Sequence, residues 1–175
     1  RCVEPFLAKT YLLHNFVDDI IKFSGNEGIR CWAMTTHRFH VFNAMQNGDE
    51  VLLSERGTGN FTHYGIIIGK VRSVEFGKAL WPFVKNEPWE YIYFLANITR
   101  VNIEKPSFVE SLGYNRKFDV AGATHVRDEK LLNFGSVSKL FGLPVFEHVA
   151  EVETEKDFYA ENILSSSKRR VGHAK

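Results

Sequence analysis

Two long stretches rich in β-forming residues decide the fold: HYGIIIGKVRSV at His63–Val74 and EYIYFLANITRVNI at Glu90–Ile103. The unbroken isoleucine run at Ile66–Ile68 predicts a strand that is buried on both faces. A shorter strand is expected at Glu50–Ser54, followed by the glycine loop RGTGN at residues 56–60. Two strands joined by a glycine loop indicate a hairpin.

The remaining elements are shorter and do not alternate regularly with the strands. The segment at Arg30–Met34 is apolar, and 77–89 is an irregular excursion with two tryptophans and two prolines. The other expected elements are a strand at Thr10–Asn15 and helices near residues 18–25, 37–46, 106–113, 128–141 and 153–164. Strands that cluster in runs favour an α+β domain. We expect a curved, barrel-like mixed sheet of about six strands, flanked by helices.

Composition and charge narrow the class of protein. The chain has 175 residues, of which 44% are hydrophobic and 25% charged, with two cysteines and a net charge of +1. No apolar run approaches the ~20 residues that span a bilayer, so no membrane partner is expected. Two cysteines outside any CxxC pair suggest a reducing, cytoplasmic compartment, with Cys31 as a small core residue.

Charge is concentrated at the C-terminal end. Residues 165–175 hold four basic residues and no acid. Removing those four charges from the net charge of +1 leaves the rest of the chain at −3. A protein that binds nucleic acid mainly through phosphates would be strongly basic. Any nucleic-acid binding by this chain must therefore use local contacts.

Motifs for catalysis, cofactors and metals are not found. Gly65–Lys70 is one residue short of a phosphate loop and lacks the following Ser or Thr. Gly57–Gly59 lacks the third glycine of a dinucleotide fingerprint, and the histidines have no HxxxH or HExxH spacing. Nothing assembles a nucleophile, a base and an oxyanion site. We therefore expect a binding domain without cofactor or metal, not an enzyme.

The three tryptophans, Trp32, Trp81 and Trp89, lie outside any regular periodic stripe. Large aromatic residues in such places more often fill a core than line a ligand site. Core packing and ligand binding both stay open on the residues alone.

The order of these segments resembles YTH domains, which with the related EVE domains belong to the PUA-like group. The resemblance rests on TYLLHNFVDDIIKF (10–23), IRCWAM (29–34), EVLLSERGTGNFTHYGIIIGKV (50–71), ALWPF (79–83) and HVRDEKLL (125–132). It implies a reader of modified bases, because YTH domains bind N6-methyladenine in an aromatic cage. EVE domains are similar modules linked to modified DNA.

The resemblance also implies roles for individual residues. Trp32, Trp81 and Trp89 match the cage walls. Asn15 and Asp19 match positions that meet the base edge, and Ala33 matches a position whose main-chain carbonyl accepts the remaining N6–H. Arg127 matches a phosphate contact, and the other basic residues expected to hold the nucleic-acid backbone are Arg30, Arg56 and Lys139.

These expectations combine into one function with open alternatives. The chain is expected to flip N6-methyladenine of DNA into an aromatic cage. By analogy with McrB-type modification-dependent restriction proteins, it would target an effector motor domain and a nuclease subunit. Alternatives are a reader of 5-methylcytosine or hydroxymethylcytosine in DNA, or of N6-methyladenine in RNA. Other classes are a small enzyme acting on RNA or nucleotides, and a protein–protein adaptor.

The chain is expected to divide into a reader domain at residues 1–150 and a C-terminal helix with a basic tail or linker at residues 151–175. Trp32→Ala and Trp81→Ala are each expected to abolish the methyl preference while leaving folding cooperative.

Overall fold

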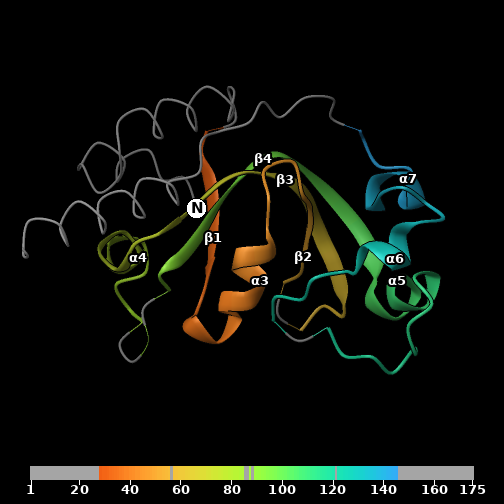
Figure 1. Ribbon diagram of the computed structural model, residues 1–175, viewed down its shortest axis with the longest axis horizontal. Helices are drawn as coiled ribbons and strands as arrows, with labels where there is room; N and C mark the ends of the chain where they lie inside the picture. Colours follow the sequence, from red (N-terminus) through yellow and green to blue (C-terminus); the bar gives the residue numbers. More distant parts are fainter. Residues whose placement is uncertain (1–27, 56, 85–86, 88, 121, 146–175) are drawn as a thin grey trace, which may run out of the picture.

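The computed structural model describes residues 28–145 apart from 56, 85–86, 88 and 121. This part of the chain is α+β, with a four-stranded antiparallel sheet in the order β1-β4-β3-β2 (Figure 1). The strands are β1 (Arg30–Met34), β2 (Glu50–Leu53), β3 (Asn60–Arg72) and β4 (Tyr91–Glu104). The helices are η2 (Thr36–Arg38), α3 (Phe39–Ala44), α4 (Val74–Leu80), α5 (Lys105–Ser111), α6 (Asp128–Leu131) and α7 (Val137–Phe141).

The two long strands β3 and β4 form the centre of the sheet, as the sequence predicts. They pair antiparallel along their full lengths, from Asn60 opposite Glu104 to Arg72 opposite Tyr91. The predicted hairpin between β2 and β3 is confirmed, and positive φ angles at Gly57 (85°) and Gly59 (69°) turn its loop. Strand β1 pairs with β4 alone and lies at the edge of the described sheet.

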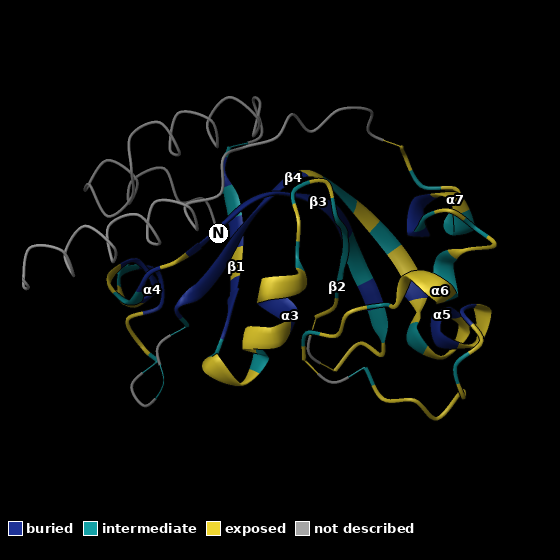
Figure 2. Cartoon of the chain, in the orientation of Figure 1, coloured by how far each residue is buried: buried dark blue, intermediate teal, exposed yellow. Residues whose placement is uncertain are grey.

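The isoleucine run is buried on both faces of β3. Ile67 packs into a cluster with Phe42 of α3, whereas Ile68 packs into a second cluster with Phe76 and Leu80 of α4. A third cluster joins the far end of β3 and β4 to α5 and α7. Figure 2 shows the resulting pattern, with β4 buried in its first half and more exposed toward α5.

A buried lysine holds α3 against the sheet. The ammonium of Lys70 on β3 donates to the main-chain oxygens of Phe42, at 2.8 Å, Asn43, at 3.1 Å, and Met45. These are carbonyls at the end of α3, which lack partners within the helix and attract positive charge. Lys70 therefore has a structural role, and the strand conformation of Gly65–Lys70 also excludes a phosphate loop there.

Several sequence-based expectations need correction. The described sheet has four strands, all antiparallel, and is not closed, so a mixed six-stranded barrel is not confirmed. The helix expected over 128–141 is two short helices, α6 and α7, with Gly135 at a φ of 79° between them. The excursion at 77–89 begins inside a helix that the sequence does not predict, α4. The elements expected at 10–25 and 153–164 lie outside the described residues, as does the boundary expected at residue 150.

Candidate functional site

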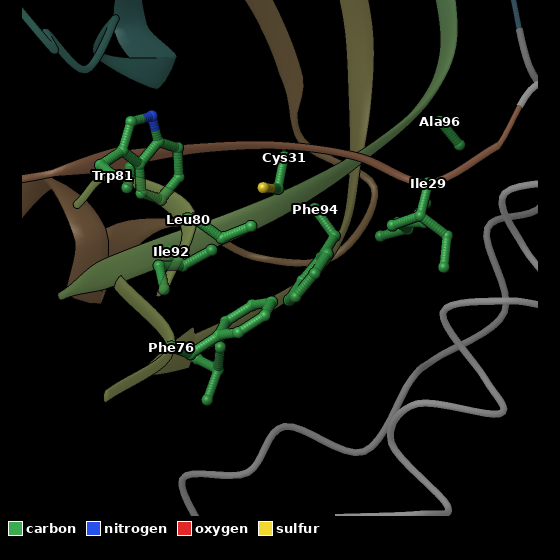
Figure 3. Close-up of a cluster of buried hydrophobic side chains, with 11 residues drawn as sticks. Ile29, Cys31, Phe76, Leu80, Trp81, Ile92, Phe94 and Ala96 are labelled. Atoms are coloured by element: carbon green, nitrogen blue, oxygen red, sulfur yellow. The ribbon is translucent and has the colours of Figure 1, made fainter. Parts of the chain in front are cut away.

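The end of the sheet that carries β1, α4 and the start of β4 brings all three tryptophans together. Trp81 terminates α4, where its main-chain N–H donates to the carbonyl oxygen of Gly77 at 2.9 Å. Helix α4 begins because the Ser73 hydroxyl caps it by accepting from the N–H of Phe76 at 3.1 Å. Trp81 is only 6% exposed and belongs to the cluster with Leu80 and Ile92. Figure 3 shows its indole at one end of this cluster.

Trp32 lies on the edge strand and is accessible. Its neighbours Cys31 and Ala33 enter the buried cluster that contains Trp81. Because side chains alternate along a strand, Trp32 points to the other side of β1. Its exposed fraction is 48%, unusual for the largest apolar side chain on a strand that is otherwise half-buried or buried.

Trp89 connects these two rings. Its ring centroid lies 6.4 Å from that of Trp32, with the planes tilted by 41°, and 5.6 Å from that of Trp81, with a tilt of 50°. Trp89 is half-buried and packs against the α4 cluster. The three indoles therefore form one continuous group, the Trp group, that runs from the buried cluster to the accessible edge of the sheet.

Polar contacts fix the segment that carries Trp89. The Glu87 carboxylate accepts from the N–H of Thr36 at 3.2 Å and lies 3.8 Å from the His37 ring. The Glu90 carboxylate accepts from Arg72 at 3.2 Å, and its main-chain oxygen accepts from Ser73 at 2.9 Å. Both carboxylates near Trp89 in the sequence thus have hydrogen-bond partners.

The Trp group is closed in this structure. Centroid separations of 5.6 and 6.4 Å are direct ring contacts, since aromatic pairs pack at 4.5–7 Å. A planar base that stacks between Trp32 and Trp89 must widen that spacing. Of the three rings, Trp32 is half-exposed, whereas Trp81 is packed in the core.

The main chain of β1 offers hydrogen-bonding groups beside the Trp group. No described strand pairs with the outer edge of β1, so alternate N–H and C=O groups of this strand face away from β4. Ala33, whose carbonyl is the expected partner of an N6–H, lies on this strand directly after Trp32, and its side chain is buried. Asn15, Asp19 and Arg56 lie outside the described residues.

The basic residues expected to hold a nucleic-acid backbone are not gathered at one place. Arg30 lies on β1, two residues before Trp32. Arg127 precedes α6 and is paired with Glu129 at 3.5 Å, and Lys139 lies exposed on α7. Helices α6 and α7 lie at the opposite end of the sheet from β1 and α4 (Figure 1). The structure therefore brings Arg30 near the tryptophans and separates Arg127 and Lys139 from them.

A polar cavity of about 280 Å³ lies beside Arg30, and sequence reasoning missed most of its residues. It is lined by Arg30, His63, Asn97 and Arg100 together with main-chain and apolar groups. His63 and Arg100 are 37 positions apart in the chain but directly opposite in the β3–β4 register. Nothing in a single sequence indicates that register, so no local motif identifies the cavity.

Burial changes the ionisation of the tyrosines behind the site. Tyr93, opposite Trp32 in the β1–β4 register, is 4% exposed, and desolvation raises the pKa of its phenol. Burial also raises the pKa of Tyr91, an effect that the nearby Arg72 guanidinium partly opposes. The described residues include no group of three or more His, Cys, Asp or Glu side chains that could hold a metal ion.

Comparisons of the chain with protein-family models, with curated proteins and with solved structures found no match. In the part of the chain that the structure describes, no helix has the length and apolar character needed to cross a bilayer.

Proposed function

We propose that the protein is a nucleic-acid-binding module that reads N6-methyladenine in DNA, with the base held by the Trp group. The observation that supports this most is the accessible indole of Trp32, 6.4 Å from Trp89, on a strand at the edge of the described sheet. A Trp that only filled the core would be covered, as Trp81 is.

The base would stack between Trp32 and Trp89, and the buried Trp81 would support Trp89 from the core. Stacking on aromatic side chains contributes ~1–3 kcal/mol per base, and unstacking a base from a duplex costs a few kcal/mol. The free energy gained by stacking and the free energy lost by unstacking are therefore similar in size. Binding is therefore expected to favour single strands, or bases that a duplex releases easily.

Recognition of the methyl group needs both contact and orientation. One methyl group in an apolar pocket discriminates by ~1–3 kcal/mol, or roughly 10–200-fold. A main-chain carbonyl of the β1 edge, at Ala33, would accept the remaining N6–H and fix the orientation of the base. Within this proposal the module binds without catalysis and delivers a motor domain and a nuclease subunit to methylated DNA.

The test is a binding panel at one stated salt concentration. It compares single-stranded DNA, duplex DNA and RNA of one sequence, each unmodified or with a single N6-methyladenine, plus DNA with a single 5-methylcytosine. The expected result is at least tenfold tighter binding of N6-methyladenine DNA than of unmodified DNA. Equal binding of modified and unmodified strands would refute the proposal. Preference for 5-methylcytosine or for RNA would reassign the ligand.

A further inference from the structure

Strand β4 carries a bulge near the cavity beside Arg30. Tyr64 pairs with Thr99 and Ile66 with Ala96, so two residues of β4, Asn97 and Ile98, lie opposite Gly65 alone. Asn97 has a φ of 54° and is the only non-glycine residue with positive φ in the described part of the chain. Bulges bend a strand and redirect its side chains, and they are frequent beside functional sites.

The bulge forms one wall of the cavity of about 280 Å³. Arg30 of β1, His63 of β3 and Arg100 of β4 line this cavity, and no Asp or Glu is among its described lining residues. His63 Nδ1 is 3.0 Å from the Thr62 hydroxyl, which donates to the main-chain oxygen of Leu53 at 3.5 Å. Two of the lining side chains, Arg30 and Arg100, carry permanent positive charge.

These two charges have no counter-ion among the described residues. Neither Arg30 nor Arg100 forms an ion pair there, whereas Arg72 and Arg127 are both paired with glutamates. Two guanidinium groups that line one concavity repel each other and attract anions. The planar donor fork of arginine matches the oxygens of a phosphate group.

We infer that this cavity binds a phosphate group, and, resting on the proposed function, that the phosphate is a backbone phosphodiester next to the bound base. Arg30 and Trp32 are two residues apart on β1 and point to the same side of the strand. Their Cα atoms are therefore about 7 Å apart. A stacked strand advances about 3.4 Å per nucleotide, so this distance corresponds to one or two nucleotides.

The test combines substitutions in the protein with neutral phosphates in the DNA. Arg100→Gln and Arg30→Gln each remove one charge, and Arg116→Gln removes one from an exposed residue outside the cavity. In single-stranded DNA with one N6-methyladenine, one backbone phosphate at a time is replaced by a neutral methylphosphonate. Inorganic phosphate is added separately as a competitor. Thermal unfolding checks that each variant folds.

The expected result is an affinity that is weaker by roughly tenfold or more for Arg100→Gln and Arg30→Gln, as for other charge-assisted hydrogen bonds. The decrease should be equal for methylated and unmethylated strands. The slope of log affinity against log salt should fall by about 0.7 for each phosphate that the variant no longer neutralises. One methylphosphonate next to the methyladenine should weaken wild-type binding but not that of Arg100→Gln. Arg116→Gln should bind like wild type.

Two results would overturn the assignment of the cavity to a backbone phosphodiester. If both cavity variants bind DNA as tightly as wild type does, the cavity holds no backbone phosphate. Competition by inorganic phosphate, without an effect of any methylphosphonate, would assign the cavity to a free anion instead. Either result leaves the proposed function standing if the protein still prefers N6-methyladenine, and loss of that preference alone leaves the phosphate site standing.

Discussion

Gly77 of α4 lies against the main chain of Trp89. A Cβ atom at position 77 would be 3.1 Å from the carbonyl carbon of Trp89 and closer still to its oxygen. Gly77 is at a negative φ in the middle of a helix, where glycine is unfavourable. Glycine at position 77 allows the main chain of Trp89 to approach α4 closely. The segment before β4 can therefore place Trp89 between the other two tryptophans.

Gly77→Ala is expected to destabilise the fold by about 1–3 kcal/mol, because the added methyl group meets main-chain atoms that cannot move alone. The Trp89 segment should shift, and indole fluorescence should change with it. Chemical denaturation and fluorescence measure both effects. Lys78→Ala, at an exposed position of the same helix, is the control and should stay within about 0.5 kcal/mol of wild type. A Gly77→Ala protein as stable as wild type would contradict this packing.

Trp81→Ala is expected to cost about 3–5 kcal/mol, since the indole is 6% exposed within the α4 cluster. Folding of this variant is still expected to be cooperative, as the sequence analysis predicts, but with a lower free energy of unfolding. Trp32→Ala, by contrast, removes a ring that is half-exposed and should change stability much less. Thermal unfolding of the two variants separates them. Equal destabilisation would show that Trp32 is a core residue.

Glu50 ties β2 and β3 to the start of α7 through its carboxylate. It accepts from the N–H of Val137 at 2.6 Å and from the hydroxyl of Tyr64 at 2.9 Å. Glu50→Gln keeps the shape but replaces one acceptor oxygen with a donor, and should cost about 1–3 kcal/mol. Unfolding measurements against Glu55→Gln, an exposed loop residue, test this. A Glu50→Gln protein as stable as wild type would show that these contacts contribute little to stability.

Stability should fall at alkaline pH because of buried tyrosines. Burial raises the pKa of Tyr64 and Tyr93 in the folded protein above the ordinary value of about 10. The unfolded chain loses these protons first, so the stabilisation is complete below about pH 10 and disappears as the pH rises toward the folded values. Phenolate absorbance should show tyrosines that ionise only with unfolding. Full, reversible ionisation of the folded protein near pH 10 would contradict their burial.

The sequence predicts the elements whose pattern is local. The isoleucine run and the glycine loop predict β3 and its hairpin with β2, because burial and turn chemistry are both visible along a short stretch. Helix α4 is not predicted, because Gly77 and the Trp–Pro pair that follows the helix weaken its helical pattern. The signal that could have found it is Ser73, a capping residue three positions before Phe76.

The site is less predictable than the strands, because it depends on contacts between distant segments. The sequence identifies the three tryptophans, but not that Trp89 lies between Trp32 and Trp81, which depends on the glycine contact of α4. The bulge at Asn97 and the pairing of His63 with Arg100 are properties of the β3–β4 register. The β3–β4 register cannot be deduced from a single sequence.

The central claim is that Trp32 and its neighbouring indoles hold a methylated base. Its most direct test is the ratio of affinities for a strand with and without one N6-methyladenine, measured for wild type, Trp32→Ala and Phe118→Ala. Phe118 is 43% exposed and stacks on Tyr114 away from the Trp group, so it is the matched control. We predict a ratio of about ten or more for wild type and Phe118→Ala, and a ratio near one for folded Trp32→Ala. An unchanged ratio in Trp32→Ala would contradict the account.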